Sequence, residues 1–294
     1  MTSVQKYLSY LRYEKNYSSL TEISYSKDLS QFEDFLNQHM ESIPLADVDS
    51  DIVRLWIAHL IENGITPRSV NRKLSSLKSF YRFLIKTGEI KANPLKRITG
   101  PKADKPIPSF VSDQDMESLL DKEVPEDDFE TYRDRTILEL LYMTGMRRAE
   151  LINIKDVDVD LSADVIRVTG KRNKQRLIPF SPETKKVILS YIEQRNKHTE
   201  NHSGHFFVKK EGGPIYPMLV YRIVHNNLKN IPTLSKASPH ILRHSFATSM
   251  LNNGAEINAV KEILGHSSLA STEVYTHTSF EELKRVYKKA HPRA

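Results

Sequence analysis

The sequence predicts two domains: an all-α helical domain, followed by a mainly α domain of the α+β class with a small antiparallel sheet. Three observations support this fold class. Apolar residues recur at helical spacing through roughly the first hundred residues, whereas residues 93–108 contain four prolines, one glycine and no periodicity. After that stretch, short strand-like runs stand among several helical ones. A length of 294 residues fits one large or two medium domains, and the change of pattern favours two.

Four helices are expected in the first domain, residues 1–92. Apolar spacing alone indicates the first two, around residues 4–11 and 23–36. A third helix starts after a cap formed by Asp49 or Ser50, and Gly64 ends it. Its predicted apolar face consists of Ile52, Leu55, Trp56, Ile57 and Leu60.

The fourth helix is predicted to carry a basic face opposite an apolar stripe. Thr66 is its expected cap, Pro67 its first residue and Gly88 its stop. The apolar stripe comprises Val70, Leu74, Leu77, Tyr81 and Leu84, and the basic face comprises Arg68, Arg72, Lys73 and Arg82. A helix of this kind fits the major groove of DNA.

Residues 93–108 are predicted to be a basic, proline-rich linker. They overlap a window, residues 67–105, with eleven Lys or Arg and two acids, a charge of +9, so the rest of the chain carries −3 of the net +6. Such a concentration is typical of proteins with a polyanion partner, because Lys and Arg near phosphates release counterions. A solvated helix face beside a charged linker is the alternative.

The second domain, residues 109–294, is expected to combine helices with one hairpin. An apolar helix over residues 132–143 ends at Gly145, and a short helix starts at Glu150. Strands are predicted at residues 164–169 and 176–180, joined by a turn, and a third at 206–208. Further helices are expected near residues 182–196, 217–228 and 242–252, and two more begin near Glu256 and Phe280.

Composition excludes several classes of chemistry. The chain has no cysteine, so disulfides, thiolate metal sites and cysteine nucleophiles are ruled out. No run approaches the roughly 20 apolar residues of a membrane span, and the N-terminus lacks the apolar core of a signal peptide. We therefore expect a cytoplasmic protein without a membrane partner.

Four segments of the second domain carry groups suited to phosphate chemistry. In chain order they are Thr144-Gly-Met-Arg147-Arg-Ala-Glu150, Gly170-Lys171-Arg-Asn-Lys174, His240-Ile-Leu-Arg243-His244 and Leu264-Gly-His266, the last followed nine residues later by Tyr275. Singly, each residue has an ordinary explanation, as a packing tyrosine, a surface ion pair or a structural histidine. A zinc site of the three histidines is opposed by the adjacent positive charge of Arg243. Independent accidents would not produce this order and spacing.

Together these segments resemble the catalytic signature of the tyrosine recombinase (lambda-integrase-like) family, and most closely its bacterial Xer branch. The resemblance extends over essentially the whole chain. It implies that the first domain is a SAM-like core-binding domain that binds DNA, and that the second is the catalytic domain. It further implies a site-specific recombinase that cuts and rejoins DNA through a 3′-phosphotyrosine intermediate.

The resemblance implies that Arg147 and Arg243 clamp the scissile phosphate, while Tyr275 attacks it. A pair of guanidinium groups suits this task, because negative charge develops on the non-bridging oxygens in the transition state. Glu150, three residues after Arg147, would support that arginine rather than act as a catalyst. No metal or nucleotide cofactor is expected, because the phosphotyrosine keeps the bond energy.

Proton transfer falls to three further residues in the same resemblance. Lys171 would protonate the 5′ leaving oxygen, and His240 would assist proton transfer at the nucleophile. His266 would hydrogen bond to a non-bridging oxygen. Two positions depart from the family's pattern: Ala149 stands where a serine is common, and Arg172 where a glycine is common. We expect these departures to affect turn geometry alone.

DNA contacts are expected from the fourth helix, the linker and the turn between the two strands. The residues are Arg68, Arg72, Lys73, Arg82, Lys102, Lys105, Arg172 and Lys174. The partner implied by the resemblance is double-stranded DNA with an inverted-repeat recombination site. It would be bound by a homotetramer, or by a heterotetramer with a paralogous recombinase.

The C-terminal helix, residues 279–290, has an apolar stripe of Phe280, Leu283 and Val286. By resemblance it would dock into a neighbouring protomer; packing on its own domain is the alternative. The two-domain length favours chromosome dimer resolution, with a septal DNA translocase as a further partner. An integrase of a simple mobile element and a type IB topoisomerase-like enzyme are the alternative functions.

Overall fold

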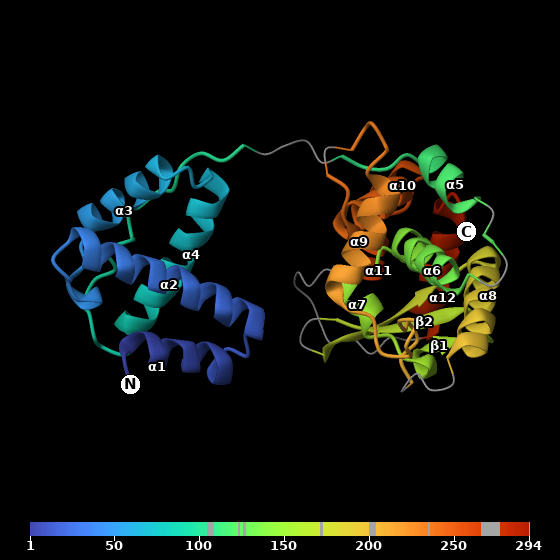
Figure 1. Ribbon diagram of the computed structural model, residues 1–294, viewed down its shortest axis with the longest axis horizontal. Helices are drawn as coiled ribbons and strands as arrows, with labels where there is room; N and C mark the ends of the chain where they lie inside the picture. The colour runs from blue at the N-terminus through green and yellow to red at the C-terminus, as the bar shows by residue number, and fades with distance from the viewer. Residues whose placement is uncertain are drawn as a thin grey trace. The chain divides into compact units, whose positions relative to one another are not determined.

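The computed structural model describes residues 1–104, 109–122, 124–125, 128–170, 173–199, 204–234, 236–265 and 277–293, without the side chains of 277–280. The chain forms two compact units, Met1–Pro106 and Ile107–Ala294 (Figure 1). Among the described helices, none has the length and apolar character needed to cross a membrane.

The first unit is entirely helical, as predicted. Its elements are α1 (Ser3–Ser9), a π-helical turn η1 (Tyr10–Glu14), α2 (Ser19–His39), a 3-10 turn η2 (Leu45–Asp47), α3 (Ser50–Glu62) and α4 (Pro67–Lys86). Asp49 caps α3, because its carboxylate accepts the backbone N–H groups of Asp51 and Ile52 at 2.9 Å. Thr66 caps α4, and Pro67 is the first residue of that helix. All four predicted helices are therefore confirmed.

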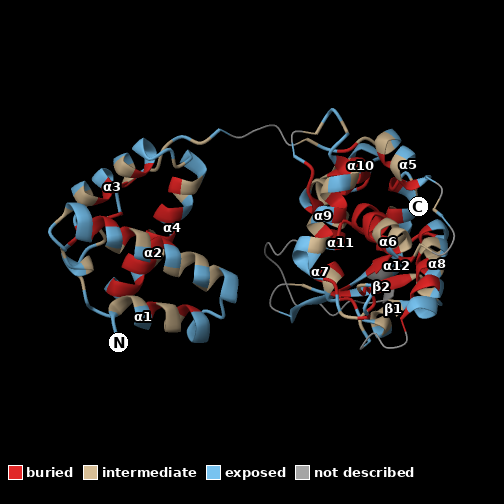
Figure 2. Cartoon of the chain, in the orientation of Figure 1, coloured by how far each residue is buried: buried red, intermediate tan, exposed pale blue. Residues whose placement is uncertain are grey.

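Aromatic side chains dominate the core of the first unit. The rings of Phe32 and Trp56 lie 4.8 Å apart between centroids, and those of Tyr7 and Phe80 lie 5.3 Å apart. These four residues come from four different helices and are all fully buried. The predicted apolar stripe of α4 is buried with them (Figure 2). The core thus holds α4 with one face inward and the other toward solvent.

Lys73 was predicted to lie on the exposed basic face of α4, and this prediction is wrong. The residue is only 6% exposed, and its Nζ lies 3.2 Å from Oδ1 of Asp28 on α2. Asp28 is itself buried and also accepts hydrogen bonds from Arg72 and Ser76. A buried lysine needs such a carboxylate partner. The apolar spacing of α4 could not reveal it, because the carboxylate comes from another helix.

The predicted linker is wrong over its first half. Leu95 and Ile98 are buried in the core of the first unit. Lys78 Nζ donates to the carbonyl of Ile98 at 2.8 Å, and Asn71 Nδ2 donates to that of Pro101 at 2.8 Å. These contacts fix the chain against α4, so the segment belongs to the helical unit despite its prolines. Lys105 and the three residues after it lie outside the described residues.

The second unit packs helices around a small antiparallel sheet. The helices are α5 (Asp113–Leu120), α6 (Phe129–Thr144), α7 (Arg148–Ile152), α8 (Pro182–His198), α9 (Pro217–Leu228), α10 (Pro239–Asn252), α11 (Ile257–Leu264) and α12 (His277–Ala290), with the 3-10 turn η3 (Asp156–Asp158). The strands are β1 (Val159–Asp160), β2 (Val165–Thr169) and β3 (Gln175–Pro179), in the order β1-β2-β3. Ile166 pairs with Ile178 in the predicted hairpin, which is confirmed. Neither α5 nor β1 had been predicted.

The long helix α6 forms the centre of the second unit, between α8 and α10 (Figure 1). Its last turns are buried on every side, including Leu140, Leu141 and Tyr142. Gly145 ends the helix in the left-handed conformation, with φ of +58°. A Cβ atom there would lie 2.5 Å from a ring carbon of Phe246 on α10, so only glycine fits this close approach.

The predicted strand at residues 206–208 is wrong. In this region the structure has isolated bridges between Lys155 and His205 and between Val208 and Pro214. Phe206 and Phe207 are nonetheless almost fully buried. A short apolar run indicates burial with more certainty than it indicates backbone pairing.

Helix α12 packs on its own unit. Leu283, Tyr287 and Ala290 are buried in the main core, and Val286 is packed against it. His291 follows the helix and lies between the rings of Tyr142, Phe246 and Tyr287. In the isolated chain, the apolar face of the helix from Leu283 onward is therefore covered by its own unit, whereas the side chain of Phe280, the first residue of the predicted stripe, lies outside the described residues. Docking of this helix into a second protomer stays a prediction.

Candidate active site

Arg147 is the N-cap residue of α7, directly after the turn that closes α6. Its Nη1 donates to Oε1 of Glu150 at 2.8 Å, and its backbone N–H donates to Oε2 of the same residue at 2.7 Å. Its Nη2 donates to the carbonyl of Gly265 at 3.0 Å. The side chain stays about a third exposed, at 36%. The guanidinium is thus oriented from two sides and still open to a ligand.

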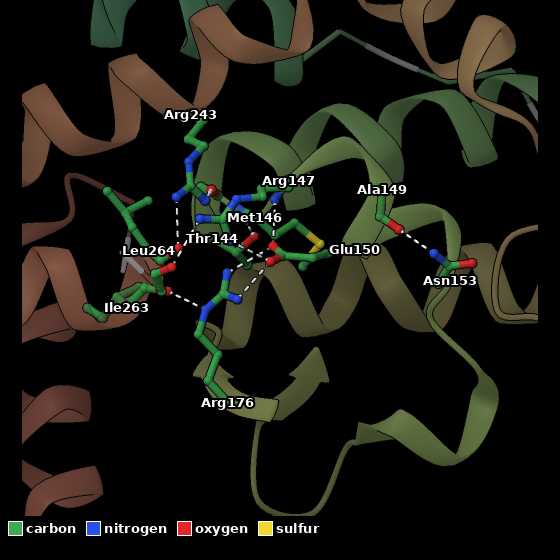
Figure 3. A network of polar contacts seen from close by, with 12 residues as sticks. Thr144, Met146, Arg147, Ala149, Glu150, Asn153, Arg176, Arg243, Ile263 and Leu264 are labelled. Carbon is green, nitrogen blue, oxygen red and sulfur yellow. Dashed lines mark hydrogen bonds and ion pairs between the residues drawn. The ribbon is translucent and has the colours of Figure 1, made fainter. Parts of the chain in front are cut away.

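Arg243 reaches the same place from α10, in which it is the fifth residue. Its Nη1 donates to the carbonyl of Gly145 and its Nη2 to that of Leu264, both at 2.7 Å. The carbonyls that hold Arg147 and Arg243 therefore belong to consecutive residues at the end of α11 (Figure 3). Burial, together with the positive charge of Arg147, lowers the pKa of Arg243 to about 10. Such a pair of cations favours a bound anion, which would relieve their repulsion.

Glu150 lies beneath the two arginines and is only 4% exposed. Besides the two bonds from Arg147, it accepts Nη1 and Nη2 of Arg176, both at 2.9 Å. Burial alone would raise the pKa of this carboxyl, but the hydrogen bonds and charge of Arg176, with those of Arg147, outweigh burial and lower it. Glu150 is therefore an ionised carboxylate, and the predicted contact with Arg147 is present.

Arg176 is the residue of this cluster that sequence reasoning missed. It lies on β3, 7% exposed, and its Nε donates to the carbonyl of Ile263 at 2.7 Å. The predicted strand nevertheless indicated that Arg176 is buried. Because side chains alternate along a strand, Arg176 shares the inward face with Ile178, where a charged residue needs a buried partner.

The remaining predicted catalytic residues divide into one described and three that are not. His240 is exposed in the first turn of α10, three residues before Arg243, so the two share one side of the helix. Lys171, His266 and Tyr275 lie outside the described residues. Two described glycines flank two of them. Gly170 approaches Glu150, since a Cβ there would be 3.2 Å from Oε1, and Gly265 supplies the carbonyl that holds Arg147.

The predicted DNA contacts have different surroundings. Arg68, Arg82, Lys102 and Lys174 are exposed. Arg72 is also exposed, but its guanidinium is paired with Asp28. Lys73 is buried, as described above, so it is withdrawn from this set. Lys105 and Arg172 lie outside the described residues.

Comparison with known proteins gives matches over both units. A model of the phage integrase family matches residues 109–282, and a model of the phage integrase N-terminal SAM-like domain matches residues 4–88. Tyrosine recombinase XerC of Chlorobaculum parvum is 40% identical over 99% of this chain and 94% of its own length. Tyrosine recombinase XerC of Staphylococcus aureus is 38% identical over 100% of this chain and 98% of its own length.

A solved structure shares the fold. The XerH site-specific recombinase bound to palindromic difH substrate, in a post-cleavage complex, has a TM-score of 0.73 over 97% of this chain and 83% of that one, at 21% identity. The helical unit and the integrase-type unit are thus both found in known recombinases. From its family matches and its close relatives, the chain belongs to the phage integrase family, as a Xer-type tyrosine recombinase.

Proposed function

We propose that this chain cuts and rejoins double-stranded DNA at an inverted-repeat site, with Tyr275 as the nucleophile. The observation that carries the proposal is the arginine cluster in the second unit. The cluster contains three guanidinium groups and one carboxylate, with Arg147 and Arg176 bound to Glu150 and Arg243 close by, so its local charge is +2. Arg147 and Arg243 each use two N–H groups on protein acceptors, and a guanidinium has more to give. A phosphodiester fits this demand in both charge and geometry.

The proposed cleavage step conserves the number of phosphoester bonds. The Tyr275 oxygen attacks the scissile phosphorus, a bond forms between them, and the bond from phosphorus to the 5′ oxygen breaks. The phenol proton leaves with help from His240, and Lys171 gives a proton to the departing 5′ oxygen. Arg147 and Arg243 stabilise the charge on the non-bridging oxygens, assisted by His266. Rejoining is the reverse, with the 5′ hydroxyl of a partner strand as nucleophile.

We further propose chromosome dimer resolution as the biological role. The full-length likeness to proteins named XerC supports this role over that of a mobile-element integrase. The proposed assembly is a homotetramer or a heterotetramer with a paralogous recombinase, in which α12 exchanges between protomers. A septal DNA translocase is the proposed controlling partner, and the compartment is the cytoplasm. Exposed Arg68, Arg82, Lys102 and Lys174 are the proposed DNA contacts.

The test is covalent capture of DNA by the intact protein. The protein is incubated with fragmented DNA from its source organism, denatured in detergent, and the attached DNA is sequenced. We expect adducts at one chromosomal locus, lost in Tyr275→Phe although that variant still binds DNA. Tyr216→Phe, which changes an exposed tyrosine of the same unit, is the matched control and keeps the adduct.

Other outcomes would redirect the assignment. Adducts at the ends of a mobile element would favour an integrase, and adducts without sequence preference would favour a topoisomerase-like enzyme. Unchanged cleavage by Tyr275→Phe would show that another residue is the nucleophile. An absolute requirement for magnesium would indicate a different class of phosphoryl transfer.

A further inference from the structure

Arg176 connects three separate parts of the second unit through one buried side chain. From β3 it reaches Glu150 on α7 with both Nη atoms and the carbonyl of Ile263 on α11 with Nε (Figure 3). The side chain is 6% exposed. All three of its nitrogen atoms therefore have protein acceptors, as a buried guanidinium requires.

Two glycines allow the chain to close around this side chain. At Gly265, a Cβ atom would lie 3.0 Å from Nη1 and 3.2 Å from Cζ of Arg176. At Gly170, a Cβ atom would lie 3.2 Å from Oε1 of Glu150 and 3.8 Å from Nη1 of Arg176. The end of α11 and the start of the β2–β3 turn thus both press on the ion pair between Arg176 and Glu150.

The ion pair between Arg176 and Glu150 determines how Arg147 binds the same carboxylate. Glu150 accepts four hydrogen bonds, two from Arg147 and two from Arg176. Because both Nη atoms of Arg176 bind the carboxylate side by side, only one Nη of Arg147 can reach it, and the other Nη turns to Gly265. Without Arg176, Arg147 would be the only arginine bound to the negatively charged Glu150. The local charge would then fall from +2 to +1.

We propose that Arg176 is a positioning residue for strand transfer. It neutralises Glu150 and holds the end of α11, and it thereby fixes the orientation of Arg147 and the carbonyls that hold both phosphate-binding arginines. It does not touch the DNA itself, because it is buried beneath Glu150. This inference rests on the proposed function, in which Arg147 and Arg243 act on the scissile phosphate.

The experiment compares Arg176→Lys with wild-type protein on two DNA substrates. One carries an ordinary scissile phosphate, and the other a methylphosphonate, in which a methyl group replaces a charged non-bridging oxygen. The neutral group depends less on correctly placed guanidinium groups. We expect Arg176→Lys to form the covalent adduct about 100-fold more slowly on the ordinary phosphate, since small displacements of catalytic groups have effects of this size. On the methylphosphonate the loss should be several times smaller.

Arg195→Lys is the matched control. Arg195 is another buried arginine of the second unit, 4% exposed, and it donates to Asp156 and to the carbonyl of Phe206 instead of to Glu150. A loss for Arg176→Lys no greater than that of this control, or an equal loss on both substrates, would overturn the proposal. Both outcomes would mean that Arg176 only supports the fold.

Two further measurements distinguish a failure of this proposal from misfolding of Arg176→Lys and from a failure of the proposed function. If Arg176→Lys does not fold, Gly170→Ala presses on Oε1 of Glu150 while leaving Arg176 in place, and the same relief on methylphosphonate is expected. Equal losses for Gly170→Ala on both substrates would count against the proposal. Absence of a Tyr275-dependent adduct in wild-type protein would instead reject the proposed function, whatever Arg176 does.

Discussion

Basic residues along α4 have unlike surroundings. Arg68 and Arg82 are exposed, whereas Lys73 is buried in an ion pair with Asp28. The sequence placed all of them on one basic face, because residue spacing records helical position but not what packs against that position. Only the exposed ones can exchange counterions for phosphates.

This difference predicts opposite effects of substitution. Arg68→Ala and Arg82→Ala should each reduce the slope of log affinity for DNA against log salt concentration by about 1, with little effect on stability. Lys73→Met should leave that slope unchanged. It should instead lower the free energy of unfolding by on the order of 3 kcal/mol, because Asp28 loses a buried partner. Binding titrations over a range of salt, with denaturant unfolding, provide the check; a changed slope for Lys73→Met would contradict the buried assignment.

The sequence predicted those residues of the site that lie in recognisable short segments. Arg147, Glu150 and Arg243 were identified by their segments, and the contact between the first two follows from their separation of three residues. Arg176 was missed, although its inward position on a predicted strand was visible. Its partners Glu150 and Ile263 lie 26 and 87 residues away, and local periodicity carries no information about such pairings.

At the scale of elements, the ends of helices position the site more than their middles do. The end of α6 at Gly145 supplies a carbonyl to Arg243, and the end of α11 supplies carbonyls to both arginines. These helix-end carbonyls lack acceptor roles inside their own helices, so they are free to bind side chains. The end of α6 was predicted at Gly145, because a glycine marks it in the sequence.

Gly145→Ala should therefore affect both stability and cleavage. The left-handed conformation costs a residue with a Cβ about 1–2 kcal/mol, and contact with Phe246 and Leu264 adds about 1–3 kcal/mol. Gly254→Ala is the matched control, because Gly254 has φ of +83° with open space around it and should show the backbone cost alone. Thermal or denaturant unfolding measures both variants. Equal losses of stability in Gly145→Ala and Gly254→Ala would show that the structure around Gly145 accommodates the added Cβ without a steric cost.

Elements without periodicity or marker residues were predicted poorly. Residues 93–101 were assigned to a linker from their prolines, yet Leu95 and Ile98 are buried. Residues 206–208 were assigned to a strand from apolar character that in fact reflects burial. In both segments, tertiary packing decides the structure, and composition alone does not report that packing.

At the scale of the whole molecule, the chain's last described turn is a part of the core. His291 is 4% exposed and packs against three aromatic rings, and Arg293 pairs with Asp121 at 3.0 Å. Removing the C-terminal helix would therefore expose apolar surface of the second unit. The proposed exchange of α12 between protomers is better studied by point substitution than by truncation, because a truncated protein loses stability as well as contacts.

His291 predicts a pH dependence of stability. Burial lowers the pKa of His291 to about 4, against about 6.5 for an exposed histidine. The neutral ring is thus favoured in the folded state, and its contribution is complete above pH 6.5. As pH falls from about 6.5 to about 4, the unfolded chain gains the proton first, and the free energy of unfolding drops by at most about 3 kcal/mol.

Denaturant unfolding of wild-type protein and His291→Phe between pH 7 and pH 4 isolates this effect. The groups around His291 are the rings of Tyr142, Phe246 and Tyr287, with Asp113 and Arg293 nearby, and they are unchanged in the variant. The difference in the free energy of unfolding between the two proteins should therefore change with pH in this range, with a slope that corresponds to at most one bound proton. Parallel curves would show that His291 is not the responsible group.

Arg147 and Arg243, the two arginines proposed to bind the phosphate, are far apart in the chain, yet each donates to one of two carbonyls that are neighbours in sequence, those of Gly265 and Leu264. Consecutive Cα atoms are always about 3.8 Å apart, whatever side chains surround them. The two guanidinium groups therefore share one anchor, a pair of consecutive carbonyls, in addition to Glu150 for Arg147 and the carbonyl of Gly145 for Arg243. A displacement of the end of α11 would disturb both charges together, even if each arginine kept its own second partner.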